Sequence, residues 1–125
     1  MKFSDCTTMD SKHTTADHIR AISNATFARL VLDGDGPIAV EFMSYGCGLC
    51  RAIEPIFQQV AAGLHSKQKL FRVNVPVEHE LAGTYGINAM PTFVMFLDGV
   101  EVARAEGPDP TRASISATVT QPFNS

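Results

Sequence analysis

Two cysteines separated by two residues, Cys47 and Cys50, are the side chains of this chain best suited to chemistry. They follow an apolar stretch, residues 38–44, and precede a stretch whose apolar residues recur every three or four positions. This second pattern predicts a helix, and the unpaired N–H groups at a helix N-terminus stabilise an anion. We therefore expect the Cys47 thiol to ionise easily and attack disulfides, and Cys50, one turn further and facing the core, to resolve the mixed disulfide.

A metal site and a pair of inert thiols are the alternative interpretations of the two cysteines. A structural zinc site needs four Cys or His ligands, commonly including a second closely spaced pair. Besides Cys47 and Cys50 the chain offers only Cys6 and four scattered histidines. We therefore expect neither a metal nor another cofactor, and we expect Cys6 to be a free thiol rather than part of a regulatory or intermolecular disulfide.

One carboxylate, Glu41, interrupts the apolar stretch that precedes the cysteines. If this side chain is buried, its pKa rises and it can exchange a proton with Cys50 near neutral pH. The alternative is a glutamate near a strand end whose carboxylate reaches water, since buried unpaired glutamates are rare. The pattern alone leaves both interpretations open.

The composition predicts one globular domain, because the chain has 125 residues of which 45% are apolar. A net charge of −3 without a cluster of Lys or Arg argues against nucleic acid as a partner. No stretch approaches the roughly 20 apolar residues of a membrane span, and the N-terminus lacks the apolar segment of a secretion signal. We expect a cytoplasmic protein, or a periplasmic or other extracytoplasmic one if a signal peptide has been removed.

Strands and helices alternate along the predicted chain. We expect an α/β fold, a central mixed sheet flanked by helices, because alternating elements that end in a hairpin pack in this way. The expected elements are a short strand at 19–22, a helix around 26–32 with Ser23 or Asn24 as its N-cap, a strand at 38–44, a helix from Cys50 to about Gly63, a strand at 69–75, a helix at 78–86, two strands within 91–107 joined at Asp98-Gly99, and a short helix after Pro110.

Several motifs, taken in order, resemble the thioredoxin family. They are IAVEF (38–42), CGLC (47–50) with Arg51 after it, Pro55, RVNV (72–75), YGINAMPT (85–92), VMFLDGVEV (94–102) and Gly107. The resemblance covers residues 17–120, which we expect to form a single domain of thioredoxin fold between a flexible N-terminal tail, 1–16, and a C-terminal tail, 121–125. It implies a thiol-disulfide oxidoreductase that reduces or exchanges protein disulfides through a redox-active Cys47–Cys50 disulfide.

The same resemblance implies roles for residues beyond the cysteine pair. Pro91 matches a cis-proline that packs against the pair, and the backbone of Met90 is then free to bind an extended substrate segment. Glu41 matches a buried acid that assists proton transfer to the second cysteine, and Arg72 matches a basic residue near that acid. The resemblance also implies a monomer. Its implied partners are protein disulfides and an electron donor of the thioredoxin-reductase type. The expected substrate-binding residues are Tyr45, Gly46, Gly48, Leu49, Met90 and Pro91.

Two positions beside the cysteines depart from the family pattern. Gly46 stands where thioredoxins usually have Trp, and Leu49 stands where they usually have Pro. Residues between the cysteines help to set the reduction potential, so the direction of exchange is open at this point. Gly48 either lets a partner chain approach closely or only fits a tight turn. The alternative function is a thioredoxin-fold binding module that docks a partner through the apolar rim of Tyr45, Leu49 and Met90, with little redox turnover.

Overall fold

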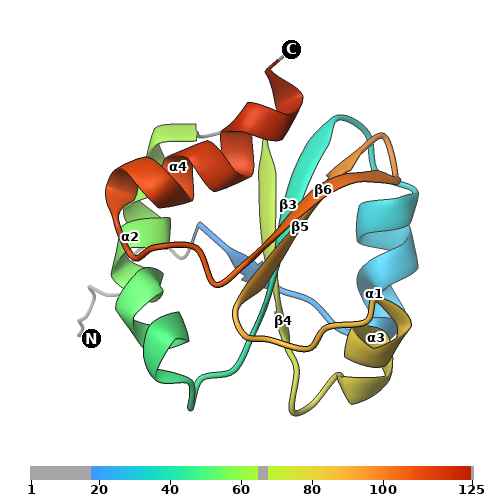
Figure 1. Cartoon of the computed structure of the whole chain (residues 1–125). Helices are drawn as coiled ribbons and strands as arrows, with labels where there is room; N and C mark the ends of the chain where they lie inside the picture. The colour runs from blue at the N-terminus through green and yellow to red at the C-terminus, as the bar shows by residue number, and fades with distance from the viewer. Residues whose placement is uncertain (1–17, 65–67, 125) are drawn as a thin grey trace, which may run out of the picture.

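A five-stranded mixed sheet lies between two layers of helices in the computed structural model, which describes residues 18–64 and 68–124. Helices α2 and α4 cover one face of the sheet, and α1 and α3 cover the other (Figure 1). The elements are β2 (Arg20–Ala21), α1 (Asn24–Phe27), η1 (Ala28–Leu32), β3 (Pro37–Met43), α2 (Gly48–Leu64), β4 (Lys69–Asn74), α3 (His79–Thr84), β5 (Thr92–Leu97), β6 (Val100–Glu106), α4 (Arg112–Thr120) and η3 (Gln121–Phe123). The predicted α/β architecture and order of elements are confirmed.

Strand β3 occupies the centre of the sheet, whose order is β2-β4-β3-β5-β6. It pairs in parallel with β4 and antiparallel with β5, and helices cover both of its faces. This double cover explains why β3 reads as an almost continuous apolar run. The register places Glu41 of β3 between Arg72 of β4 and Phe93 of β5.

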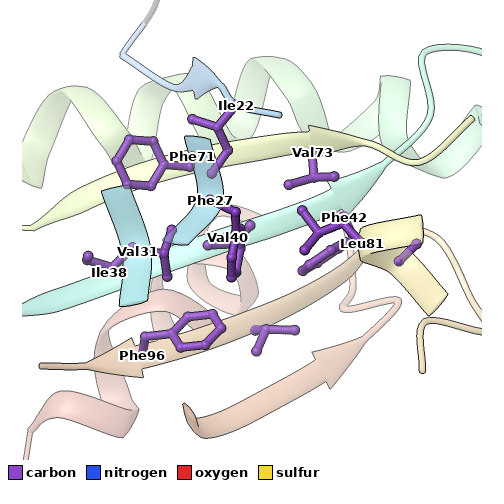
Figure 2. Packing of buried hydrophobic residues seen from close by; sticks show 12 residues of the cluster. Ile22, Phe27, Val31, Ile38, Val40, Phe42, Phe71, Val73, Leu81 and Phe96 are labelled. Carbon is purple, nitrogen blue, oxygen red and sulfur yellow. The ribbon is translucent and has the colours of Figure 1, made fainter. Parts of the chain in front are cut away.

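Successive residues of the strands enter two separate cores, because strand side chains alternate between the faces of a sheet. The core on the α1 and α3 side contains Val40 and Phe42 of β3 together with Phe27, Phe96 and Leu81 (Figure 2). The core on the α2 and α4 side contains Ala39, Phe93 and Phe57. Glu41 lies two residues after Ala39 and directly opposite Phe93, so its side chain faces the second core, beneath the helix that carries the cysteines.

The predicted hairpin at Asp98-Gly99 is confirmed. Both residues have positive φ, 50° for Asp98 and 83° for Gly99, as a two-residue hairpin turn of type I′ requires. A Cβ atom on Gly99 would lie only 2.2 Å from the carbonyl oxygen of Leu32. Glycine is therefore needed at this turn both for its backbone conformation and for its lack of a side chain.

The structure differs from the sequence-based expectations in three places. The first helix follows Ser23, which confirms one of the two expected N-caps, but after Phe27 it continues as a π-helical turn over Ala28–Leu32 instead of a regular α-helix. Helix α2 begins at Gly48, two residues earlier than expected. Residues Gln121–Phe123, expected in a tail, form a 3-10 turn whose Phe123 packs on the second core, so the folded chain continues past residue 120.

The expectations for the N-terminal tail, 1–16, and for Cys6 lie outside the described residues. Within 18–64 and 68–124, no helix combines the length and the apolar character that crossing a membrane requires.

Candidate active site

Cys47 lies immediately before α2, where its sulfur caps the helix. The backbone N–H of Cys50 donates a hydrogen bond to the Cys47 Sγ at 3.3 Å, and the Arg51 N–H donates to the Cys47 carbonyl oxygen at 3.0 Å. An N-cap side chain normally accepts such a bond from the third helical residue, and here a sulfur takes that place. Cys47 is partly exposed, whereas Cys50 is only 1% exposed and faces the core, as expected.

The two thiols differ strongly in acidity because of this arrangement. Hydrogen bonds from the Cys50 thiol and from the backbone N–H groups of Cys50 and Leu49 hold the pKa of Cys47 below its ordinary value, and the charge of Arg51 adds to the effect. Burial raises the pKa of Cys50 to about 12, with smaller contributions from the Cys47 sulfur and the Glu41 carboxylate. The exposed sulfur is thus the one that ionises first.

A cis peptide bond between Met90 and Pro91 lies against the cysteine pair. The Cys47 thiol donates a hydrogen bond to the Met90 carbonyl oxygen at 3.5 Å. This loop is anchored on both sides of the proline: the Thr92 hydroxyl donates to the Ala89 carbonyl oxygen at 2.7 Å, and the Gly107 N–H donates to the Pro91 carbonyl oxygen at 2.8 Å. The structure therefore brings Met90 and Pro91 to the cysteines from a position more than 40 residues away in the chain.

Five of the six expected substrate-binding residues form an accessible rim beside Cys47, whereas the sixth, Pro91, is buried. Tyr45, Gly46 and Gly48 are exposed, Leu49 is half-buried, and Met90 is 37% exposed. The Arg51 guanidinium donates to the Tyr45 carbonyl oxygen at 3.3 Å and so braces the turn before Cys47. A Cβ atom on Gly48 would meet nothing within 4 Å, and the φ of Gly48 is not positive. Neither crowding nor backbone conformation requires glycine there, which disfavours the tight-turn interpretation.

Glu41 is fully buried, so the interpretation of this residue as a glutamate that reaches water is wrong. Neither of its carboxylate oxygens has a hydrogen-bond partner among the described residues. Burial raises the pKa of Glu41 to about 8; the negative charge of Glu54 adds to the rise, and the positive charge of Arg72 opposes it. A carboxyl group that titrates near neutral pH therefore lies in the core under the cysteine helix.

Arg72 lies opposite Glu41 in the strand register, but its ion pair is with another residue. Its guanidinium donates to the Oε2 atom of Glu54 on α2 at 2.5 Å. The sequence reasoning did not single out Glu54. The spacing of Glu54 could have indicated its place near the site, because a residue four positions after Cys50 lies on the same face of a helix.

Among the described residues, no group of three His, Cys, Asp or Glu side chains is placed to hold a metal ion. A mixed sheet between two helix layers, with a dithiol at a helix N-terminus facing a cis-proline, defines the thioredoxin fold with a Cys-x-x-Cys site.

Sequence comparison identifies the family. Residues 18–121 match the family model described as Thioredoxin. A thioredoxin of Aspergillus fumigatus is 35% identical over 106 residues, which cover 82% of this chain and 96% of the relative. Thioredoxin 1 of a Nostoc species is 33% identical over 98 residues, covering 78% and 91%. The solved structure of a Malassezia sympodialis thioredoxin superposes with a TM-score of 0.70 at 31% identity, covering 82% of this chain and 89% of that one. This chain belongs to the thioredoxin family.

Proposed function

We propose that this protein is a thiol-disulfide oxidoreductase that reduces or exchanges protein disulfides through Cys47 and Cys50. One observation carries the proposal: a partly exposed cysteine of lowered pKa lies in hydrogen-bond contact with a buried cysteine at the start of a helix. The thiolate is the nucleophile of disulfide exchange, and the buried partner is placed to attack it in turn. Family membership supports the same class of reaction.

The reaction runs in two exchange steps. In the first step the Cys47 thiolate attacks one sulfur of the substrate disulfide, forms a mixed disulfide and releases the other substrate sulfur as a thiolate. In the second step Cys50 loses its proton and attacks the Cys47 sulfur, which releases the remaining substrate sulfur. The substrate gains two electrons and two protons, and the enzyme is left with a Cys47–Cys50 disulfide.

Glu41 is the proposed proton carrier for the second step. Cys50 has a pKa of about 12 and must be deprotonated before it attacks. The buried Glu41 carboxyl, whose charge acts on Cys50, has a pKa of about 8 and so can take up a proton near neutral pH. A group whose pKa lies near the operating pH is the most effective general acid or base. Arg72 lies opposite Glu41, and its positive charge limits the rise of the Glu41 pKa that burial causes.

The rim residues are the proposed substrate-binding surface. The carbonyl oxygen of Met90 already accepts a hydrogen bond from Cys47, so a substrate segment laid along Met90 and Pro91 comes within reach of the attacking sulfur. Tyr45, Gly46, Gly48 and Leu49 flank Cys47 in the chain, on the turn before α2 and in the first turn of that helix. A donor of the thioredoxin-reductase type would reduce the Cys47–Cys50 disulfide after each turnover, with the protein acting as a monomer in the cytoplasm.

Turnover of a model protein disulfide tests this proposal. Insulin reduction, with dithiothreitol as the electron source, is measured for the unaltered chain and for Cys47→Ser, Cys50→Ser and Cys6→Ser. We expect Cys47→Ser to abolish the acceleration over dithiothreitol alone and Cys6→Ser to leave it unchanged. Cys50→Ser should stall as a mixed disulfide on Cys47, detectable by mass. An unchanged rate in Cys47→Ser would reject the proposal.

A binding module is the second candidate, favoured by the exposed aromatic and apolar side chains of the rim. Tyr45 is 54% exposed and Met90 is 37% exposed, which suits docking of a partner protein. The double variant Cys47→Ser/Cys50→Ser separates the two candidates. Loss of the cellular role, with fold and partner binding intact, would exclude the binding module, whereas a retained role would exclude redox turnover as the function.

A further inference from the structure

Glu54 of α2 links the cysteine helix to strand β4. Its Oε2 atom accepts hydrogen bonds from the Arg72 guanidinium at 2.5 Å and from the Gln58 side-chain amide at 2.9 Å. The other oxygen, Oε1, is buried and has no hydrogen-bond partner among the described residues. Glu54 comes one helical turn after Cys50, so the cysteine and the carboxylate share the face of α2 that packs against the sheet.

The Arg72 side chain is only 5% exposed, and two carboxylates lie within its surroundings. Glu41 is its register partner on the neighbouring strand, whereas Glu54 reaches it from helix α2. Within the described chain both oxygens of Glu41 lack a hydrogen-bond donor, while Glu54 receives the guanidinium. The cation in this core is thus directed to the carboxylate on the helix instead of the carboxylate on β3.

We propose that Glu54 is a positioning residue: by binding the Arg72 guanidinium it keeps this cation from pairing with Glu41, and so sets the pH range over which Glu41 exchanges a proton with Cys50. The inference deepens the proposed function and its link to Cys50 rests on it. The described hydrogen bonds of the Glu54 carboxylate are with Arg72 and Gln58, so its proposed effect on Glu41 runs through Arg72 and through charge.

The groups that face Glu41 account for the size of the expected effect. Arg72 faces it from β4, Glu54 and Cys50 face it from α2, and β5 contributes the apolar Phe93. An ion pair with arginine lowers a carboxyl pKa by about 1 to 3 units, and a like charge raises it. Loss of the Glu54 charge therefore lowers the pKa of Glu41 in two ways. It removes the repulsion between the two carboxylates, and it removes the ion pair that draws the Arg72 guanidinium toward α2 and away from the Glu41 oxygens, which lack donors among the described residues.

Carbon-13 NMR of the side-chain carboxyl of Glu41 tests the inference without requiring turnover. The full reduced chain is titrated as the unaltered protein, as Glu54→Gln and as Glu80→Gln, the last a glutamate exposed on α3 that serves as the matched control. We expect Glu54→Gln to move the midpoint of the Glu41 titration down by at least about one pH unit. We expect the control to leave the midpoint unchanged. A midpoint that stays or rises in Glu54→Gln would overturn the inference.

The Arg72→Gln background shows whether Glu54 acts through the guanidinium. In that background Glu54→Gln should move the Glu41 midpoint by clearly less than in the unaltered chain, because no cation is released. Equal shifts in the two backgrounds would mean that Glu54 acts by its charge alone and would overturn the positioning role. If Glu54→Gln does not fold, Glu54→Asp draws the carboxylate back by one methylene and should give a smaller downward shift; an unchanged midpoint would then count against the inference.

The pH profile of insulin reduction separates this inference from the proposed function. If the unaltered chain turns over, the limb of its profile that follows Glu41 should move down with the NMR midpoint in Glu54→Gln. A profile that stays fixed while the midpoint moves would reject the link to Cys50. If the unaltered chain shows no turnover, the proposed function fails, while the NMR titration still decides whether Glu54 positions Arg72.

Discussion

Replacing Glu41 by glutamine should stabilise the reduced protein, by an amount that grows with pH. The Glu41 carboxyl has a pKa of about 8 in the folded chain and an ordinary value of 4.5 once it is exposed by unfolding. Between these values the folded chain holds a proton that the unfolded chain has lost. The free energy of unfolding therefore falls as pH rises through this window, and the contribution is fully present only below the unfolded value.

The expected size of the effect follows from the distance between the two pKa values. One unit of pKa difference corresponds to about 1.4 kcal/mol, so Glu41 alone should lower the free energy of unfolding by about 3 kcal/mol between about pH 5 and pH 7. The whole window corresponds to about 5 kcal/mol. Small domains are stable by about 5 to 15 kcal/mol, so this loss is a large share of the total. The glutamine amide keeps the size of the side chain and stays neutral, so the variant should lack this slope.

Urea unfolding of the reduced chain at pH values from about 5 to 9 measures the effect. Far-UV circular dichroism is the suitable signal because the chain has no tryptophan. The unaltered chain is compared with Glu41→Gln and with Glu80→Gln, the exposed control. The cysteines titrate in all three proteins, so their contribution cancels in the differences to a first approximation. If the difference in the free energy of unfolding between the unaltered chain and Glu41→Gln stays constant from about pH 5 to pH 8, the pKa of Glu41 is not raised in the folded chain.

Three further substitutions test the local arguments by urea unfolding. Gly99→Ala should lower the free energy of unfolding by at least about 1 kcal/mol, because it places a Cβ at positive φ against the Leu32 carbonyl oxygen; an unchanged midpoint would contradict the turn assignment. Thr92→Val should cost about 1 kcal/mol, because the half-buried Ala89 carbonyl oxygen loses its donor; a neutral effect would show that this bond does not hold the loop. Gly48→Ala should be neutral or stabilise by up to about 1 kcal/mol, because alanine suits a helix better than glycine, and a clear loss of stability would restore the tight-turn interpretation.

The features that the sequence predicts best depend on contacts close in the chain. The hairpin followed from Asp98-Gly99, because few residues other than Asn, Asp and Gly adopt positive φ readily. The inward position of Cys50 followed from the period of apolar residues in α2, since Ile53 and Phe57 lie on the same face and are buried. The cis-proline at Pro91 could be expected only from the family resemblance.

The features that the sequence did not predict depend on contacts between distant segments. Whether Glu41 is buried depends on how β3 pairs with β4 and β5, and a single acid in an apolar stretch does not determine that pairing. The ion pair between Arg72 and Glu54 joins a strand to a helix and requires one rotamer of each long side chain. Docking of Phe123 on the second core likewise depends on where α4 crosses α2, which no local pattern encodes.

The redox equilibrium of the Cys47–Cys50 pair tests the central claim most directly. The reduced chain is equilibrated in dithiothreitol and glutathione redox buffers, free thiols are alkylated, and the mass of the peptide that carries both cysteines is measured. We expect an intramolecular disulfide that forms in one two-electron step. A potential near or below about −250 mV would make the protein a reductant, and one above about −200 mV would make it an oxidant or isomerase. A folded chain that forms no intramolecular disulfide in any buffer would show that Cys47 and Cys50 are not a redox couple.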